Sequence, residues 1–470
     1  MTSATSGIAA IELAKNFSGQ LLQPTDADYD QARKVHNGLV NKRPALIAQC
    51  RGVADVVDAV NLARKQGLEV AIRGGGHNVA GHASVDGGLV IDLTLTKGIH
   101  IDPRGRIARA QGGVTWAEFN RETQLHGLAV TGGVVSTTGI AGLTLGGGIG
   151  WLMGKYGLAL DNLRSVELVT AEGEVLRTSK DEEADLFWAV RGAGGNFGVA
   201  TSFEYQLHPV GPTITGGLVA HPFERSRDVL KFFRDVIASL TDECTVFAGL
   251  IHAPDGSGMK LAVMVTCHCG SLAAGEREVR PLKQFGCPVM DAIGPMPYCQ
   301  LNGMLDAAYP KGALNYWKSS FLAQLSDEAI ETMIECFARC PTPMGQLLLE
   351  HFHGAATRVP VSDTAFPHRL NGCNFLVLSE WMEPSNTDRC IAWACETYAE
   401  MKPFVAASRY VNYLGNDETG DPMAAAYGPN YRRLQELKTK HDPNNFFHMN
   451  QNIRPLTMGR PQPDESSCVQ

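Results

Sequence analysis

The sequence predicts an α+β fold of two domains, with the second domain inserted into the first. At 470 residues the chain exceeds the roughly 250–300 residues at which a single hydrophobic core stops growing. Glycines and short strand-like segments fill the first 210 residues and return after residue 408, whereas the residues between have fewer glycines and longer helical patterns. We therefore expect a first domain over residues 1–210, an inserted domain over 211–408 and a return to the first domain over 409–470.

The first domain is predicted to consist of short strands and helices, and residues 26–44 read as a helix and a loop before the first strand. Apolar side chains at helical spacing run through residues 53–65, and Gly67 follows as a residue that favours the end of a helix. A further helix is expected over residues 116–126, ended by Gly127. Strands are expected at residues 45–50, 70–73, 88–93, 99–102 and 107–111.

The inserted domain is predicted to be an antiparallel sheet covered by helices. Residues 225–240 and 327–340 have helical periodicity, whereas residues 245–252, 260–267 and 374–381 read as strands. In the last of these strands Leu376, Leu378 and Glu380 share one face, because side chains alternate along a strand.

Composition excludes several classes of function. The net charge is −8 and no block of basic residues occurs, which disfavours a nucleic-acid partner or an anionic membrane surface. No apolar run reaches the 18–20 residues of a membrane span, and the N-terminus does not resemble a secretory signal. The 12 cysteines are scattered, as is typical of reduced cytoplasmic thiols, so we expect a cytoplasmic protein. The sequence gives no indication of an oligomeric state.

Glycines gather in three clusters, over residues 73–81, 132–150 and 192–198. Glycine lets backbone approach a phosphate group closely and lets several N–H groups point the same way. A dinucleotide is the ligand that would touch all three clusters, although each cluster alone would also suit a tight turn. The G-x-G-x-x-G fingerprint is absent, so a Rossmann fold is not expected.

Four motifs in order resemble the berberine-bridge-enzyme-like flavin oxidases of the vanillyl-alcohol-oxidase superfamily, and within them the bacterial branch that includes 6-hydroxy-D-nicotine oxidase. The motifs are IRGGGHNVAGH, GGVVSTTGIAGLTLGGGIG, DLFWAVRGAGGNFGV, and YVNYLGN followed by the segment ending FFHMNQNI. The match covers roughly residues 25–455. It implies the two-domain FAD-binding fold of that superfamily, with the inserted domain binding the substrate.

The resemblance implies bound FAD and assigns residues to it. His77 matches the histidine that bonds covalently to the flavin, whereas Val135 stands where some members carry a second, cysteine anchor. A single covalent link through His77 is therefore expected. The backbone of Val199 would meet the adenine, and Asn412, Asn450 and Gln451 would lie on the flavin side. The complete set implied for the cofactor is Arg73, Gly74, Gly75, Gly76, His77, Asn78, Gly81, Gly133, Val134, Thr137, Thr138, Gly139, Gly142, Leu143, Gly148, Val199, Asn412, Asn450 and Gln451.

Flavin oxidation of an alcohol or amine also needs a group that removes a proton. Tyr413 matches a tyrosine that resembles a base in plant members, and a packed tyrosine is the alternative interpretation. The carboxylate base of other members aligns with Leu378, so Glu380 is the substitute, although an exposed strand glutamate is the simpler interpretation of Glu380. If the segment is a strand, Tyr410 points away from the face of Tyr413 and is structural.

The expected activity is an FAD-dependent oxidase that removes a hydride and a proton from a small organic alcohol, amine or hemiacetal and reduces O2 to H2O2. The resemblance places Thr138 where a small side chain lets oxygen reach the flavin and a leucine blocks it. A flavin dehydrogenase with another acceptor is the alternative, and a non-catalytic flavin-binding protein is a third hypothesis.

Other clusters are weaker candidates. Cys267 and Cys269 flank His268, but no second ligand pair follows at zinc spacing, so no metal is expected. His351 and His353 share a strand face; they are candidates for the pocket wall, although a packed pair is the simpler interpretation. His82 is expected to be a surface or supporting residue. Cys336 and Cys340 lie one helical turn apart and are expected to face the core.

Overall fold

The structure is a computed structural model, and it describes residues 17–456. A four-stranded sheet near the N-terminus has the order β1-β2-β4-β3, in which β4 runs parallel to β2 and β3. Helix α3 packs on it through Val56, Val60 and Ala63, the apolar stripe that the periodicity predicted. The elements are α2 (Tyr29–Ala32), β1 (Gln20–Leu22), β2 (Leu46–Gln49), α3 (Val53–Gln66), β3 (Val70–Arg73) and β4 (Leu89–Asp92).

A five-stranded antiparallel sheet follows, in the order β5-β6-β10-β8-β9. Its inner face packs on α4, α5 and α7 around Trp116, Phe203 and Tyr205. The elements are β5 (Ile99–Asp102), β6 (Ile107–Gln111), α4 (Trp116–Gln124), β7 (Leu128–Ala129), α5 (Ile140–Gly146), α6 (Met153–Tyr156), β8 (Leu163–Val169), β9 (Val175–Ser179), α7 (Ala184–Val190), β10 (Val199–Gln206) and β11 (His208–Pro209).

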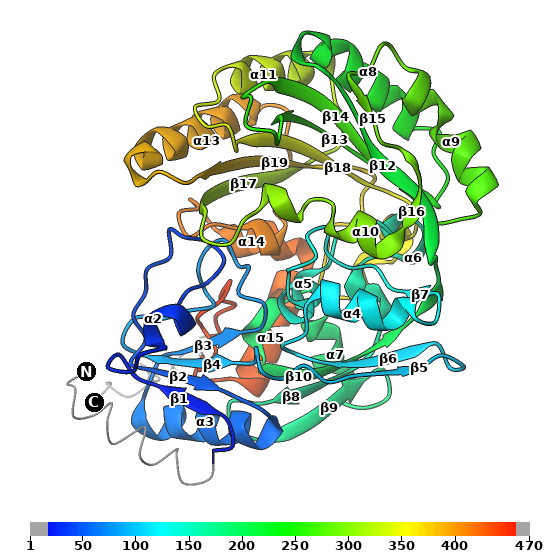
Figure 1. Cartoon of the computed structure of the whole chain (residues 1–470). Coiled ribbons are helices and arrows are strands. Elements are labelled where there is room, and N and C mark those ends of the chain that lie inside the picture. The colour runs from blue at the N-terminus through cyan, green and yellow to red at the C-terminus, as the bar shows by residue number, and fades with distance from the viewer. Residues whose placement is uncertain (1–16, 457–470) are drawn as a thin grey trace, which may run out of the picture.

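Residues 213–381 build a large antiparallel sheet in the order β15-β12-β14-β13-β18-β19-β17, with β16 paired to β12. Helices α8, α9, α11 and α13 cover its outer face, and the inner face looks toward the glycine-rich half of the molecule (Figure 1). The elements are β12 (Thr213–Pro222), α8 (Ser226–Ile237), β13 (Cys244–His252), β14 (Lys260–His268), α9 (Leu272–Gln284), β15 (Met290–Asp291), β16 (Gly294–Pro297), α10 (Tyr298–Gly303), β17 (Leu314–Leu322), α11 (Asp327–Ala338), β18 (Gln346–Phe352), α12 (Ala355–Arg358), β19 (Gly372–Trp381) and α13 (Thr387–Met401).

After α13 the chain returns to the glycine-rich half (Figure 1). It forms the short 3-10 helix η7 (Val411–Tyr413) and the helices α14 (Pro422–Tyr427) and α15 (Tyr431–His441). Lys438 of α15 is fully buried and donates hydrogen bonds to Asp442 and to the carbonyls of Asn196 and Phe447. These bonds fix the C-terminal return against the third glycine cluster.

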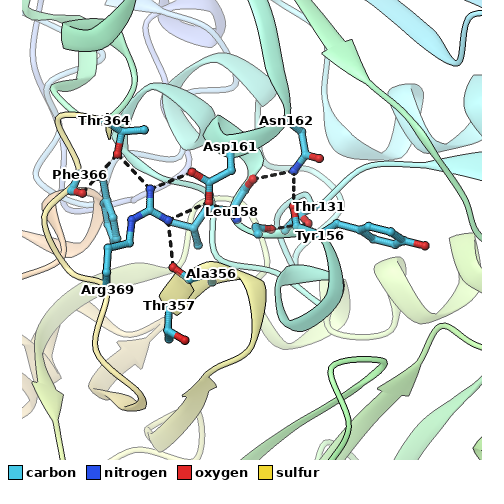
Figure 2. A network of polar contacts seen from close by, with 12 residues as sticks. Thr131, Tyr156, Leu158, Asp161, Asn162, Ala356, Thr357, Thr364, Phe366 and Arg369 are labelled. Atoms are coloured by element: carbon cyan, nitrogen blue, oxygen red, sulfur yellow. Dashed lines mark hydrogen bonds and ion pairs between the residues drawn. The ribbon is translucent and has the colours of Figure 1, made fainter. Parts of the chain in front are cut away.

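A buried ion pair joins the two halves of the molecule (Figure 2). The guanidinium of Arg369 donates to both carboxylate oxygens of Asp161 at 2.8 Å, and also to the carbonyl of Ala356 and the hydroxyl of Thr364. Asp161 belongs to the 3-10 turn η1 (Ala159–Asn162). The first two N–H groups of this turn donate hydrogen bonds to the carbonyls of Gly148 and Gly147 in the second glycine cluster. The pair therefore connects the inserted sheet to the glycine cluster.

Within residues 17–456 no helix is both long and apolar enough to cross a bilayer.

Candidate active site

A cavity of about 870 Å³ separates the glycine clusters from the inner face of the large sheet. One wall comes from the glycine-rich half and the C-terminal return, and the other comes from strands of the large sheet. Of the residues implied for the cofactor, fourteen lie in the wall: Gly74, Gly75, Gly76, His77, Asn78, Gly133, Val134, Thr138, Gly139, Gly142, Leu143, Asn412, Asn450 and Gln451.

The glycines of this wall leave room for a bulky ligand to contact the backbone directly. A Cβ atom added at Gly142, Gly194 or Gly195 would meet nothing within 4 Å, so each position is open on the side where a side chain would stand. Gly75 and Gly139 are in close contact with each other, since a Cβ on Gly75 would lie 2.3 Å from the Gly139 nitrogen. The first two clusters thus form one continuous backbone surface, which suits an extended dinucleotide such as FAD.

The remaining implied residues are absent from the cavity wall, and all of them but Thr137 are packed inside the protein. Arg73 is buried, with a guanidinium nitrogen 3.6 Å from Asp92, and its Nε donates to the carbonyl of Ala83, so it supports the loop rather than lining the cavity. Gly148 packs against Ala159, and Gly81 packs against Val40. The side chain of Val199 lies in the core, although its neighbours Gly198 and Ala200 line the cavity. Thr137 is exposed, and its hydroxyl contacts the ring of His77.

His77 is held on three sides in the cavity wall. Its Nε2 lies 3.0 Å from the Thr137 hydroxyl and its Nδ1 lies 3.5 Å from the Thr138 hydroxyl. Its ring stacks on His36 with centroids 3.9 Å apart. Burial lowers the pKa of His77 to about 3, so the imidazole is neutral near pH 7. A neutral ring keeps the nitrogen lone pair that bond formation requires.

A carboxylate that the sequence analysis did not single out lies beside Tyr413. Glu350, in β18, lines the cavity and is buried. Its Oε1 accepts a hydrogen bond from the Tyr413 hydroxyl at 3.1 Å, and its Oε2 accepts one from the Asn374 amide at 2.8 Å. Burial raises the pKa of Glu350 to about 7, although the two hydrogen bonds act in the opposite direction.

Comparison with known proteins identifies the family. Residues 44–179 match the FAD binding domain family model, and residues 409–454 match the model described as berberine and berberine like. The chain is 34% identical to (R)-6-hydroxynicotine oxidase of Paenarthrobacter nicotinovorans, over 94% of this chain and 97% of that protein. It is 31% identical to an FAD-linked oxidoreductase of Dictyostelium discoideum, over 95% and 96%. The chain belongs to the berberine-bridge-enzyme-like family of FAD-linked oxidoreductases.

A solved structure confirms the fold of this berberine-bridge-like enzyme. The crystal structure of 6-hydroxy-D-nicotine oxidase from Arthrobacter nicotinovorans superposes with a TM-score of 0.86 and 31% identity, over 94% of this chain and 99% of that one. The expected α+β fold and the resemblance to the bacterial branch are therefore confirmed.

Tyr413 is a hydrogen-bond donor in the berberine-bridge-like enzyme. Burial, and then the nearby charge of Glu350, hold the pKa of Tyr413 well above its usual value of 10, so the phenol keeps its proton. The segment is the 3-10 helix η7 rather than a strand. Tyr410 is structural as expected, because its hydroxyl accepts hydrogen bonds from the Gly148 N–H and the Asn412 amide.

Glu380 occupies a different place from the one expected. Its exposed fraction is 0%, so the interpretation as an exposed strand glutamate is wrong. It does not lie in the cavity wall, whereas Leu376 and Leu378 of the same strand do. Neither carboxylate oxygen has a hydrogen-bond partner among the described residues, and burial raises the pKa of Glu380 to about 8.

The remaining candidates lie away from the reacting groups, except His82. His82 lies in the cavity wall, not at the surface. His351 and His353 stack on each other outside the wall, so they do not form part of the pocket. Cys336 is buried in the core, and no group of side chains among residues 17–456 has the composition of a metal site.

Proposed function

We propose that this enzyme is an FAD-dependent oxidase that removes a hydride and a proton from a small organic alcohol, amine or hemiacetal and passes the electrons to O2, forming H2O2. The observation that carries the proposal is the hydrogen bond between half-buried Tyr413 and buried Glu350, a pair that borders the same cavity as the glycine clusters and Asn412. Bound FAD supplies the acceptor for two electrons. The protein must supply the acceptor for the proton.

Glu350 takes the role of base. A carboxyl whose pKa lies near 7 is partly ionised at neutral pH and is basic enough to accept a proton from an N–H or O–H group. Tyr413 and Asn374 donate to its two oxygens, so they orient the carboxylate and stabilise its charged form. Tyr413 is thus part of the proton-accepting unit, as the sequence suggested, but as the donor that positions the base. Glu380, outside the cavity wall, has no such contact with a bound substrate.

His77 is the single point of covalent attachment in this proposal. The neutral imidazole and its two threonine partners support the assignment. Val135 lines the cavity where a second anchor would stand, and none of the cysteines in the described part of the chain lies in the wall.

Oxygen is the proposed acceptor because Thr138, a small side chain, lies in the cavity wall. Its hydroxyl is turned toward His77, so it adds little bulk on the cavity side. We also propose residues 211–408 as the substrate-binding domain. The cysteines of the described residues carry free thiols, which supports a cytoplasmic, reducing environment.

The test is a panel of alcohols, amines, sugars and phenols mixed with the purified enzyme. We expect one class to bleach the flavin without oxygen and to release H2O2 in air. Bleaching that yields no peroxide but reduces an artificial dye would show a dehydrogenase. A flavin that no donor class bleaches would contradict the catalytic proposal.

A further inference from the structure

The cavity extends well beyond the residues that hold the cofactor and base, along the inner face of β12, β14 and β13. Phe247 of β13 pairs with Glu350 of β18 across the sheet, so this part of the cavity begins at the base. From Phe247 to Ile251 the strand advances four residues, which is about 14 Å at about 3.4 Å per residue. The cavity wall continues past Ile251 into the hairpin between β13 and β14, through Ala253 and Pro254.

The strands place apolar side chains in register along this length. Val263 and Val265 of β14 lie opposite Ala220 and Leu218 of β12, and Leu261 lies opposite Ile251 of β13. Met290 of β15 lies opposite Ala220 at the outer edge of the sheet and is 53% exposed, so this open edge of the surface is apolar as well. We call this surface the apolar track, and its residues are Leu218, Ala220, Phe247, Ile251, Ala253, Leu261, Val263, Val265 and Met290.

The track offers almost nothing to a polar ligand. In the part of the wall that β12 to β15 and their hairpin provide, His252 is the one titratable side chain, and its Nδ1 lies 3.2 Å from the carbonyl of Gly345. The hydroxyls of a sugar bound here would lose water without gaining side-chain partners, which is costly. A hydrocarbon or aromatic group would gain free energy from the same burial.

We propose that the substrate carries an extended aliphatic or aromatic group that lies along the apolar track while its oxidisable carbon sits at Glu350. This inference rests on the proposed function, because it takes Glu350 as the site of proton removal. It makes the substrate an apolar alcohol or amine and not an oligosaccharide. The apolar track then determines which substrates the enzyme binds.

A homologous series of straight-chain alkanols, from 1-butanol to 1-decanol, tests the track by binding alone. Titration calorimetry on the FAD-loaded enzyme measures the Kd of each alcohol. We expect the Kd to fall about three- to fourfold for each added methylene, because each buries a similar apolar area. The heat capacity change of binding should become more negative along the series. A Kd that does not depend on chain length would overturn the proposal.

Two variants locate the binding to the track. Ala220→Phe fills its middle, and Met290→Glu places a charge beside Ala220 on the exposed edge strand β15, where folding is not at stake. In each variant the Kd should stop falling at a shorter alkanol than it does in the unmodified enzyme. Ala273→Phe, at an exposed position of α9 on the opposite side of the sheet, is the matched control and should leave the series unchanged. If the Kd depends on chain length in the same way in all three variants, the alcohols bind elsewhere and the proposal is wrong.

The same experiment separates this inference from the proposed function. If chain-length dependence is found but no apolar alcohol or amine reduces the flavin, the track stands and the assignment of oxidation at Glu350 fails. If sugars reduce the flavin and affinity shows no chain-length dependence, the oxidase stands and the track fails.

Discussion

At the scale of single residues, the proposed mechanism depends on one carboxylate, that of Glu350. Glu350 stands in the segment QLLLEHF, where it follows three leucines and is the one acidic group of the strand. An acidic residue among leucines was the sequence feature that could have indicated Glu350. Burying a carboxylate costs free energy unless the carboxylate has a partner or a function. Sequence reasoning passed over Glu350 because the partner, Tyr413, lies 63 positions away.

The pH dependence of flavin reduction should report the Glu350 carboxyl. The rate should rise with pH around a midpoint near 7, since the charged form accepts the proton. Tyr413→Phe removes a donor that favours the charged form, so the pKa should rise and the midpoint should move up by about one unit or more. Tyr309→Phe is the matched control, because the Tyr309 hydroxyl bonds Gln346 and not Glu350. An unmoved midpoint in Tyr413→Phe would show that the phenol does not act on this carboxyl.

His77→Ala should retain FAD through the glycine clusters but release it on acid precipitation, giving a colourless pellet. The unmodified enzyme and His82→Ala, a second histidine of the cavity wall, should both give yellow pellets. Peptide mapping should place the flavin on His77. Flavin found on a cysteine would refute single attachment.

At the scale of elements, hydrophobic periodicity predicted the helices and strands that bury one face and expose the other. β5 and β6 have the predicted bounds, and α3 and α11 differ from prediction by one or two residues at their ends. Helices α9 and α13 were missed; α9 carries Pro281 inside it, which argues locally against a helix. Asn412 and Tyr413 lie in a 3-10 turn fixed by Tyr410, a contact that only the folded chain reveals.

The Arg369–Asp161 pair should be one of the strongest ties between elements. Arg369→Met leaves the buried Asp161 carboxylate without its partner, which typically costs about 3–5 kcal/mol. Urea unfolding followed by flavin and tryptophan fluorescence measures the loss. Arg358→Met is the control, because its ion pair with Asp242 is exposed and such pairs contribute little. Equal shifts in both variants would contradict the structural role given to Asp161.

At the scale of the whole molecule, family motifs predicted the fold, and most of the residues that they imply for FAD line one cavity. They did not predict the substrate wall, which the large sheet builds from side chains that no motif constrains. Fourteen implied cofactor residues line one cavity, whereas the base and the apolar track come from strands whose register the sequence does not state.

Oxygen access is a property of the assembled cavity. Thr138→Leu should slow reoxidation of the reduced enzyme in air-saturated buffer while leaving reduction by the donor unchanged. Thr138→Val keeps the size of the side chain and should reoxidise as fast as the unmodified enzyme. Slow reoxidation already present in the unmodified enzyme would favour the dehydrogenase.

The most direct test of the central claim is the rate of anaerobic flavin reduction in Glu350→Gln, measured by rapid mixing with the best donor of the panel. Glutamine keeps the size of the side chain and one accepting oxygen, but its NH2 group only donates and the amide cannot accept a proton at neutral pH. Loss of a general base typically lowers the rate by about 10²–10⁴-fold, and the dependence on pH near 7 should disappear with it. Reduction at an unchanged rate, with the same pH midpoint, would show that Glu350 is not the base.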